Sequence, residues 1–168
     1  IAEWWWPIGA DGKPRPPRCI LPLGVDVRTL TGTLRMIFDA RFINLFARYI
    51  PFHSERLQDA LAYLTQGGWL GVADYKAGYH HLSALGMCEY LGFYWQGTVY
   101  CFLVCPFGFA PACRMFSELN FLMFRPLRQL GLEMSSYLDD RLSHNKQQVQ
   151  AKLDTLILYA TTFICGWY

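Results

Sequence analysis

The six cysteines of this 168-residue chain form no CxxC pair and no other spacing typical of a zinc site. Several lie inside apolar runs such as 100–107, where a free thiol packs as a small hydrophobic side chain. The sequence also contains no signal-peptide pattern and no uncharged run of bilayer-spanning length. These absences argue against a zinc module and a membrane span. We therefore expect a reducing, intracellular compartment.

The net charge of +2 is too small to indicate a nucleic-acid-binding protein by itself. Residues 1–56 nevertheless carry eight basic and five acidic side chains, whereas the remainder carries seven basic and eight acidic ones. A basic N-terminal part and a slightly acidic remainder are consistent with an enzyme that binds phosphates with one part and metals with the other. A solvated basic face explains the same numbers, and charge alone does not decide. The hydrophobic share of 53% predicts a packed core.

Apolar periodicity and breaker residues predict a series of short elements. In chain order they are a hairpin of 18–25 and 33–38, a helix over 54–64 capped by Ser54, a strand over 69–75, a second hairpin of 90–95 and 98–104 turning at Gln96–Gly97, a helix over 110–130 ended or kinked by Pro126, a strand–turn–strand over 133–142, and a helix over 146–159. This order indicates an α+β fold with a mostly antiparallel sheet.

Two successive acids, Asp139 and Asp140, lie where the 133–142 hairpin turns. Asp is a common turn residue, so a solvated surface turn is one interpretation. The flanking residues Met134, Tyr137 and Leu142 are apolar, however, and would set the turn at the edge of a core. Adjacent carboxylates there repel each other unless a cation neutralises them. Oxygen ligands of this kind select magnesium or manganese.

Asp74 ends the strand predicted over 69–75. In isolation it could simply cap the following turn. If the sheet brings it beside Asp139 and Asp140, three carboxylates can hold two metal ions roughly 3.5–4 Å apart. That combination favours phosphoryl transfer.

Four blocks of the chain resemble reverse transcriptases, in family order and at family spacing over about residues 13–145. They are the Tyr-x-Asp-Asp box at 137–140, the first palm motif at 74–79, a Pro-Phe-Gly block at 105–113 followed by Phe116, and the fingers block at 34–44. The amino-acid sequences of the blocks most resemble those of retrotransposons of the DIRS group.

The resemblance implies a polymerase right-hand fold of the α+β class, with an antiparallel palm sheet, helices on one face of it and a fingers subdomain. The fingers would take about 12–72 and 84–106, and the palm about 73–83 and 107–168. The implied activity is RNA-directed DNA polymerisation from an RNA/DNA primer-template and dNTPs, with two Mg²⁺ ions and Mn²⁺ as an alternative. The oligomeric state is left open.

The resemblance also assigns roles at the metal site. Asp74 and Asp139 would bind both metals, and Asp140 would support them as a neighbouring carboxylate. The backbone carbonyl of Tyr75 would supply a further ligand.

Nucleotide-binding roles follow from the other blocks. Arg35 would hold the triphosphate, since a guanidinium fork matches phosphate oxygens; Arg28 either reaches the γ-phosphate or is an ordinary surface residue. Tyr79 would crowd the sugar 2′ position or simply belong to the core. The remaining nucleotide-binding residues would be Ala77, Gly78, Phe107 and Gly108, while Asp39, Arg41 and Asn44 would be structural and template-side.

The sequence departs from the family pattern in two places. Cys105 replaces a leucine, and Arg141 follows the acid pair where an apolar residue is common. Arg141 would either weaken metal binding or point into solvent. Both termini begin or stop abruptly, so we expect the sequence to be part of a longer chain. The sequence is too short to include the thumb, connection and RNase H domains. The alternative is therefore a catalytically inactive, nucleic-acid-binding remnant; an RNA-templated polymerase of another kind is disfavoured by Tyr79.

Overall fold

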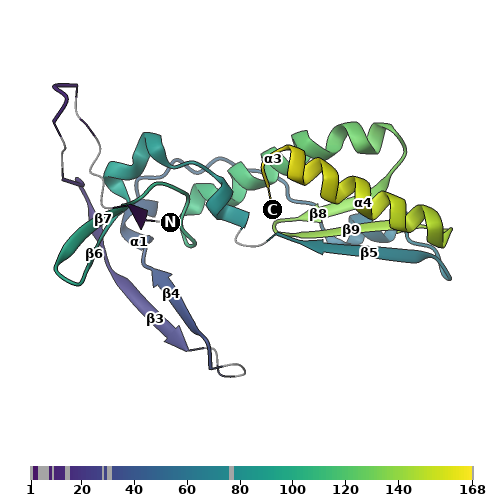
Figure 1. Ribbon diagram of the computed structural model, residues 1–168, viewed down its shortest axis with the longest axis horizontal. Coiled ribbons are helices and arrows are strands. Elements are labelled where there is room, and N and C mark those ends of the chain that lie inside the picture. Colours follow the sequence, from purple (N-terminus) through teal and green to yellow (C-terminus); the bar gives the residue numbers. More distant parts are fainter. Residues whose placement is uncertain are drawn as a thin grey trace. The chain divides into compact units, whose positions relative to one another are not determined.

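A computed structural model describes residues 2–3, 8, 10–13, 16–27, 29, 32–75 and 78–167 (Figure 1). The chain divides into two compact units, the first formed by 1–49 and 79–112, and the second by 50–78 and 113–168. Of the predicted site residues, Arg28 and Ala77 lie outside the described residues. None of the described helices combines the length and apolar character needed to cross a membrane.

The first unit contains two sheets. One has the strand order β1-β7-β6-β2 and the other pairs β3 with β4. The bounds are β1 (Ala2–Glu3), β2 (Ile20–Leu21), β3 (Leu23–Val27), β4 (Leu34–Phe38), α1 (Arg41–Asn44), a 3₁₀ helix (Leu85–Tyr90), β6 (Gly92–Trp95) and β7 (Thr98–Phe102).

The first predicted hairpin is confirmed in β3 and β4, which pair antiparallel from Leu23–Phe38 to Val27–Leu34. The single strand predicted over 18–25 is wrong in its bounds, because this segment forms two strands, β2 and β3, that belong to different sheets. β2 pairs in parallel with β6, and Pro22, which has no N–H to donate, separates it from β3.

The second predicted hairpin, β6 and β7, is confirmed with its turn at Gln96–Gly97. Both turn residues have positive φ, 45° and 82°, which is the pattern of a type I′ turn. Behind this hairpin Phe102 packs against Phe93 and Phe38, with ring centroids 4.8 and 4.9 Å apart. These rings form the core of the first unit.

The second unit is built on a three-stranded antiparallel sheet in the order β5-β9-β8. Its elements are α2 (Leu57–Leu61), β5 (Trp69–Asp74), α3 (Ala110–Gln129, whose first three residues belong to the first unit), β8 (Glu133–Tyr137), β9 (Asp140–Asn145) and α4 (Gln148–Ile164); a 3₁₀ helix, Gly78–His81, spans the unit boundary. The predicted strands of this region are therefore confirmed.

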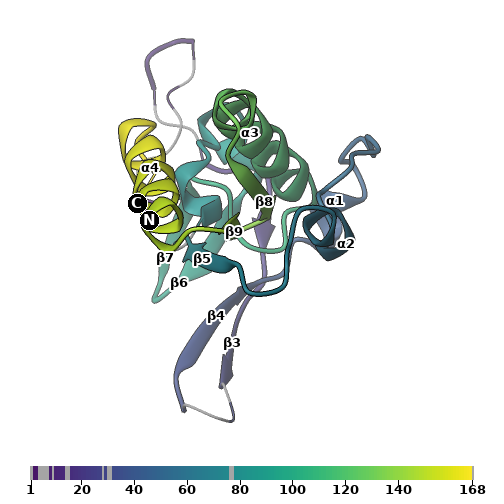
Figure 2. The same cartoon turned by 90° about the vertical axis from the view of Figure 1, so that its right-hand side faces the viewer.

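Helices α3 and α4 cover one face of this sheet (Figure 2). Gly71 on β5 faces α4 so closely that a Cβ atom there would overlap Oγ1 of Thr155. On β9, the hydroxyl of Ser143 lies 3.3 Å from the same Thr155 hydroxyl. Because side chains alternate along a strand, Leu70 and Val72 point to the opposite face, where they are 55% and 68% exposed.

Two helix predictions need correction, and the helix predicted over 110–130 is confirmed. The helix predicted over 54–64 is only Leu57–Leu61, because the Asp59 carboxylate caps it by accepting from the Arg56 N–H at 2.7 Å, and Ser54 does not. The helix predicted over 110–130 is α3, which ends at Gln129 and contains Pro126, so Pro126 does not end it. The last helix extends to Ile164, five residues beyond the prediction.

None of the six cysteines forms a disulfide, and Cys101 is fully buried. Burial raises the pKa of Cys101 from 9.0 to about 11. Because the thiolate is the reactive form, this shift lowers the thiolate fraction near pH 8 by about a hundredfold. We expect iodoacetamide to alkylate the exposed Cys165 at pH 8 and to spare Cys101, whose rate should rise only as the pH approaches 11. Peptide mass spectrometry measures this, and equal labelling of the two would contradict it.

Candidate active site

The strand register places two of the three predicted acids opposite each other. Asp74, the last residue of β5, pairs with Asp140, the first residue of β9, and Asp140 also pairs with Tyr137 on β8. Directly opposed residues in an antiparallel pair have Cβ atoms about 4.5–5.5 Å apart and point to the same face. Both carboxylates are exposed. The β5–β9 pairing therefore brings together acids that are distant in the sequence.

Asp139 lies in the two-residue turn between β8 and β9. The other turn residue, Leu138, has a φ of 51°, whereas that of Asp139 is not positive, and this is the pattern of a type II′ turn. A leucine in the left-handed region is unfavourable by about 1–2 kcal/mol, so the surroundings must hold it.

Two hydrogen bonds hold this turn. The side-chain Nδ2 of Asn120, a buried residue of α3, donates to the Leu138 carbonyl at 3.0 Å. The backbone N–H of Tyr75 donates to the Asp139 carbonyl at 3.1 Å and so extends the β5–β9 pairing by one residue. We did not predict Asn120 from the sequence. The only signal was an amide among the apolar residues of the helical stripe, at a position that the structure shows to be buried.

Gly78, predicted to bind nucleotide, lies against Asp139 within the second unit. A Cβ atom at position 78 would overlap Oδ1 of Asp139 and would lie 2.8 Å from the ring of Phe116. The absence of a side chain at 78 therefore allows the Asp139 carboxylate and the Phe116 ring to occupy this space.

Replacing Gly78 by alanine should disturb both neighbours. We expect a loss of about 1–3 kcal/mol in the free energy of unfolding, typical of overpacking, and weaker manganese binding because Asp139 must move. Urea denaturation and calorimetric titration measure these effects. Gly86→Ala is the matched control, since a Cβ at position 86 meets no atom of the described part of the chain within 4 Å. Wild-type stability and manganese affinity in Gly78→Ala would show that the contact is unimportant.

The chemistry of these carboxylates fits a hard divalent cation. Their arrangement is not a ready-made cage: among the described residues, no three His, Cys, Asp or Glu side chains are grouped so that they could hold one metal ion. Asp74 and Asp140 are exposed, so their carboxylates have room to rotate toward a shared ion. The donor set is thus suitable, and metal binding would require side-chain movement.

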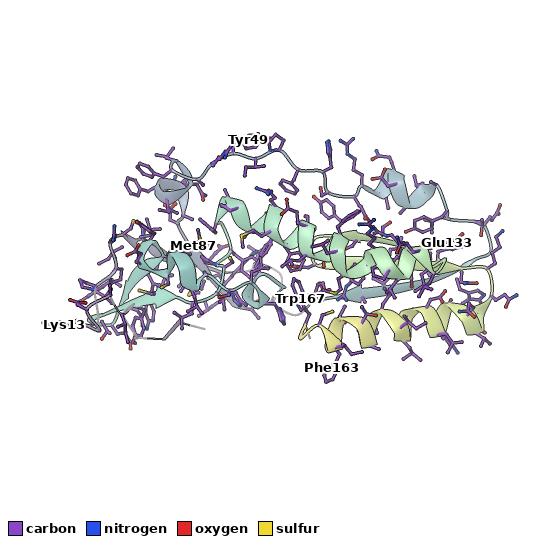
Figure 3. All side chains as sticks on the ribbon, turned by 90° about the horizontal axis from the view of Figure 1, so that it is seen from above. Lys13, Tyr49, Met87, Glu133, Phe163 and Trp167 are labelled. Atoms are coloured by element: carbon purple, nitrogen blue, oxygen red, sulfur yellow. The ribbon has the colours of Figure 1, made fainter. Side chains whose placement is uncertain are left out.

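Behind the acids, Tyr75 is buried with its ring centroid 5.6 Å from that of Phe116 and 5.2 Å from that of Trp167. Figure 3 shows Trp167 at the end of the unit remote from Glu133. Burial raises the pKa of Tyr75 to about 12. The phenol therefore stays neutral at physiological pH and contributes to the core beneath the acids.

Arg141 is buried, with 3% of its surface exposed. The expectation that it could point into solvent is therefore wrong. Its guanidinium carbon lies 3.4 Å from the centroid of the Tyr75 ring. Residue 141 lies opposite Ala73 in the β5–β9 register, on the face that the helices cover, and this explains its burial.

Three of the predicted nucleotide-binding residues lie in a row within the first unit. The guanidinium of Arg35, on β4, is 5.7 Å from the centroid of the Phe107 ring. Phe107 in turn makes an edge-to-face contact with Tyr79, with centroids 5.2 Å apart. Arg35 is exposed, whereas Tyr79 is only 8% exposed. The arrangement combines a cation, a ring face and a buried phenol.

Gly108 has a φ of 93°, a conformation that favours glycine. Asn44 clamps the segment around it: its Nδ2 donates to the Gly108 carbonyl at 2.8 Å, and its Oδ1 accepts from the Ala110 N–H at 2.9 Å. Nearby, Asp39 accepts two side-chain hydrogen bonds from Arg41, which lower the pKa of Asp39 to about 2. Both observations agree with the structural roles predicted for these residues.

No family model and no curated protein matches the chain. Similar solved structures include the native protease–reverse transcriptase of prototype foamy virus (TM-score 0.75, 17% identity over 89% of this chain) and its selenomethionine-labelled CSH mutant (0.78, 17% over 92%). A foamy viral protease–reverse transcriptase in complex with RNA/DNA hybrid is also similar (0.75, 15% over 89%). This chain spans 20% of the length of each. The likeness shows a reverse-transcriptase-like α+β fold.

Proposed function

We propose that this chain is the core of an RNA-directed DNA polymerase that adds deoxynucleotides to a primer 3′ oxygen. The observation that carries the proposal is the β5–β9 register, which sets Asp74 opposite Asp140 and beside the turn residue Asp139. The similar fold of the foamy virus enzymes supports it. We further propose that the chain derives from a retrotransposon, and that the sequences of its motifs place it nearest to the DIRS group.

In this proposal Asp74 and Asp139 are the residues that hold metal, with Asp140 as a supporting carboxylate and the Tyr75 carbonyl as a further ligand. When bound, two magnesium ions, or manganese in their place, supply Lewis-acid stabilisation of charge on the reacting phosphate oxygens. Asn120 acts indirectly, because it fixes the Leu138 carbonyl and with it the turn that presents Asp139. It is therefore a positioning residue.

Most of the proposed nucleotide-binding residues belong to the first unit, and Ala77 and Gly78 belong to the second. Arg35 would pair with the triphosphate through its guanidinium fork and neutralise charge that develops during transfer. Tyr79 would exclude a sugar 2′ hydroxyl, and its contact with Phe107 would hold the phenol ring in place. Phe107 and Gly108 would lie beneath the nucleotide. Arg28, Ala77 and Gly78 complete the proposed nucleotide-binding set.

We propose an RNA/DNA primer-template as the macromolecular partner and a dNTP as the small-molecule substrate. The similar foamy viral proteins have been solved in complex with double-stranded DNA and with RNA/DNA hybrid. The division into fingers and palm near 12–72 with 84–106, and 73–83 with 107–168, is part of the same proposal.

The second candidate is an inactive nucleic-acid-binding remnant that keeps the fold. It is favoured by the lack of a preassembled group of three metal ligands among the described residues. The buried cation at Arg141, next in sequence to the acid pair, favours it as well.

Calorimetric titration with Mn²⁺ separates the two candidates. We expect the wild-type chain to bind Mn²⁺ and Asp139→Asn to bind it at least about tenfold more weakly, because a charged ligand is lost. Primer extension on an RNA template should likewise require Asp139. Equal Mn²⁺ binding by the two proteins, or no binding by either, would favour the remnant.

A further inference from the structure

Arg141 lies one position along the sheet from the paired acids Asp74 and Asp140. It follows Asp140 on β9 and is opposite Ala73 on β5, the residue before Asp74. Its side chain is on the helix-covered face of the sheet and is 3% exposed. A positive charge is therefore built into the sheet directly behind the carboxylates.

The guanidinium has unusual surroundings for a buried cation. Its carbon lies 3.4 Å from the Tyr75 ring centroid and 6.0 Å from that of Phe124. Its Nε and Nη1 atoms are buried and have no hydrogen-bonding partner among the residues that the structure describes. Stacking on an aromatic face offsets only part of the cost of removing a guanidinium from water. An apolar side chain would fit these surroundings at a lower cost.

The negative charges near Arg141 are those of the candidate metal site. Asp74, Tyr75 and Arg141 line one cavity of about 440 Å³, and Asp140 and Arg141 line a second of about 470 Å³. Burial lowers the pKa of Arg141, and the nearby Tyr75, Tyr159, Asp74 and Asp139 oppose that effect. An arginine keeps its proton under such conditions.

We propose that Arg141 is an internal counter-cation of the three-carboxylate site, which reduces repulsion among the acids before metal enters and lowers the affinity of the site for divalent metal. The inference rests on the proposed function, because it treats the three acids as metal ligands. Under this inference, Arg141 helps to determine the metal concentration at which the site is half-occupied.

Coulomb's law gives the direction and the size of the effect. Arg141 attracts the carboxylates but repels an incoming divalent ion, and the repulsion is lost when the residue is neutral. For a singly and a doubly charged group separated by about one Debye length, at an effective dielectric constant of about 20, salt screening leaves a change in affinity of about tenfold. Removing the charge should therefore tighten metal binding by about that factor.

The experiment is calorimetric titration of the metal-free chain with Mn²⁺, using wild type, Arg141→Met and Arg141→Gln. Two neutral replacements guard against a failure of one to fold, which circular dichroism detects. Arg125→Met is the control, since it removes a charge from the exposed surface of α3 in the same unit. We expect both position-141 variants to bind about tenfold more tightly than wild type, and the control to bind as wild type does.

The sign of the change separates this role from a structural one, because a loosened fold would weaken metal binding. Unchanged or weaker binding in a folded position-141 variant would overturn the counter-cation role. If wild type binds Mn²⁺ in an Asp139-dependent way, that result leaves the proposed function intact. If neither wild type nor the variants bind Mn²⁺, the proposed function fails together with this inference.

Discussion

Asp74→Asn should reduce primer extension on an RNA template by at least about a hundredfold while leaving the fold intact. Asparagine has nearly the same shape as aspartate, so the β5–β9 pairing should persist. What is lost is one negative charge at the position opposite Asp140. The initial rate of dNTP incorporation with Mg²⁺ measures the effect, and circular dichroism verifies the fold.

The control for this substitution is Glu118→Gln in the same unit. It removes a carboxylate that forms a surface ion pair with Arg114, at 2.7 Å. Such pairs contribute little to stability, so the control should extend primers at the wild-type rate. Polymerisation by Asp74→Asn at a rate near that of wild type would rule out Asp74 as a metal ligand.

Phe116→Ala should have the largest effect on stability, a loss of about 3–5 kcal/mol in the free energy of unfolding. The Phe116 ring is fully buried and contacts the rings of Tyr75 and Trp167, with centroids 5.6 and 5.0 Å apart. Its removal would leave a cavity beneath Gly78 and Asp139. Urea denaturation followed by circular dichroism measures the loss.

Phe121→Ala provides the comparison on the same helix. Phe121 is 53% exposed, so its truncation should cost less than about 1 kcal/mol. The two variants remove the same atoms from α3 and differ only in burial. Equal losses of stability would mean that the rings around Phe116 do not form the core of the second unit.

The local elements of this protein could be read from the sequence where a short-range signal exists. A short apolar run predicted β5, the turn around Leu138–Asp140 predicted β8 and β9, and Gln96–Gly97 predicted the hairpin whose turn has two positive φ values. The predictions that went wrong depended on tertiary or side-chain detail. Asp59 rather than Ser54 caps α2, and α4 continues to Ile164, five residues beyond its predicted end.

The candidate site could be predicted as a set of residue types but not as an arrangement. The sequence identifies the three acids as possible metal ligands by their residue type. It does not give the strand register that pairs Asp74 with Asp140, because that pairing joins segments far apart in the chain. The burial of Arg141 depends on which face of β9 the helices cover. The contact between Gly78 and Asp139 depends on the fold as well, since the two residues are distant in the sequence.

The β5–β9 pairing also has a kinetic consequence. The segment that links Asp74 to Asp140 includes much of the first unit and all of α3. Closing so long a loop is slow, and contacts of this kind form late in folding compared with local hairpins. The metal binding proposed for the three acids should therefore recover during refolding no faster than the sheet of the second unit. A nascent or partly unfolded chain would carry all three acids and yet have no assembled site.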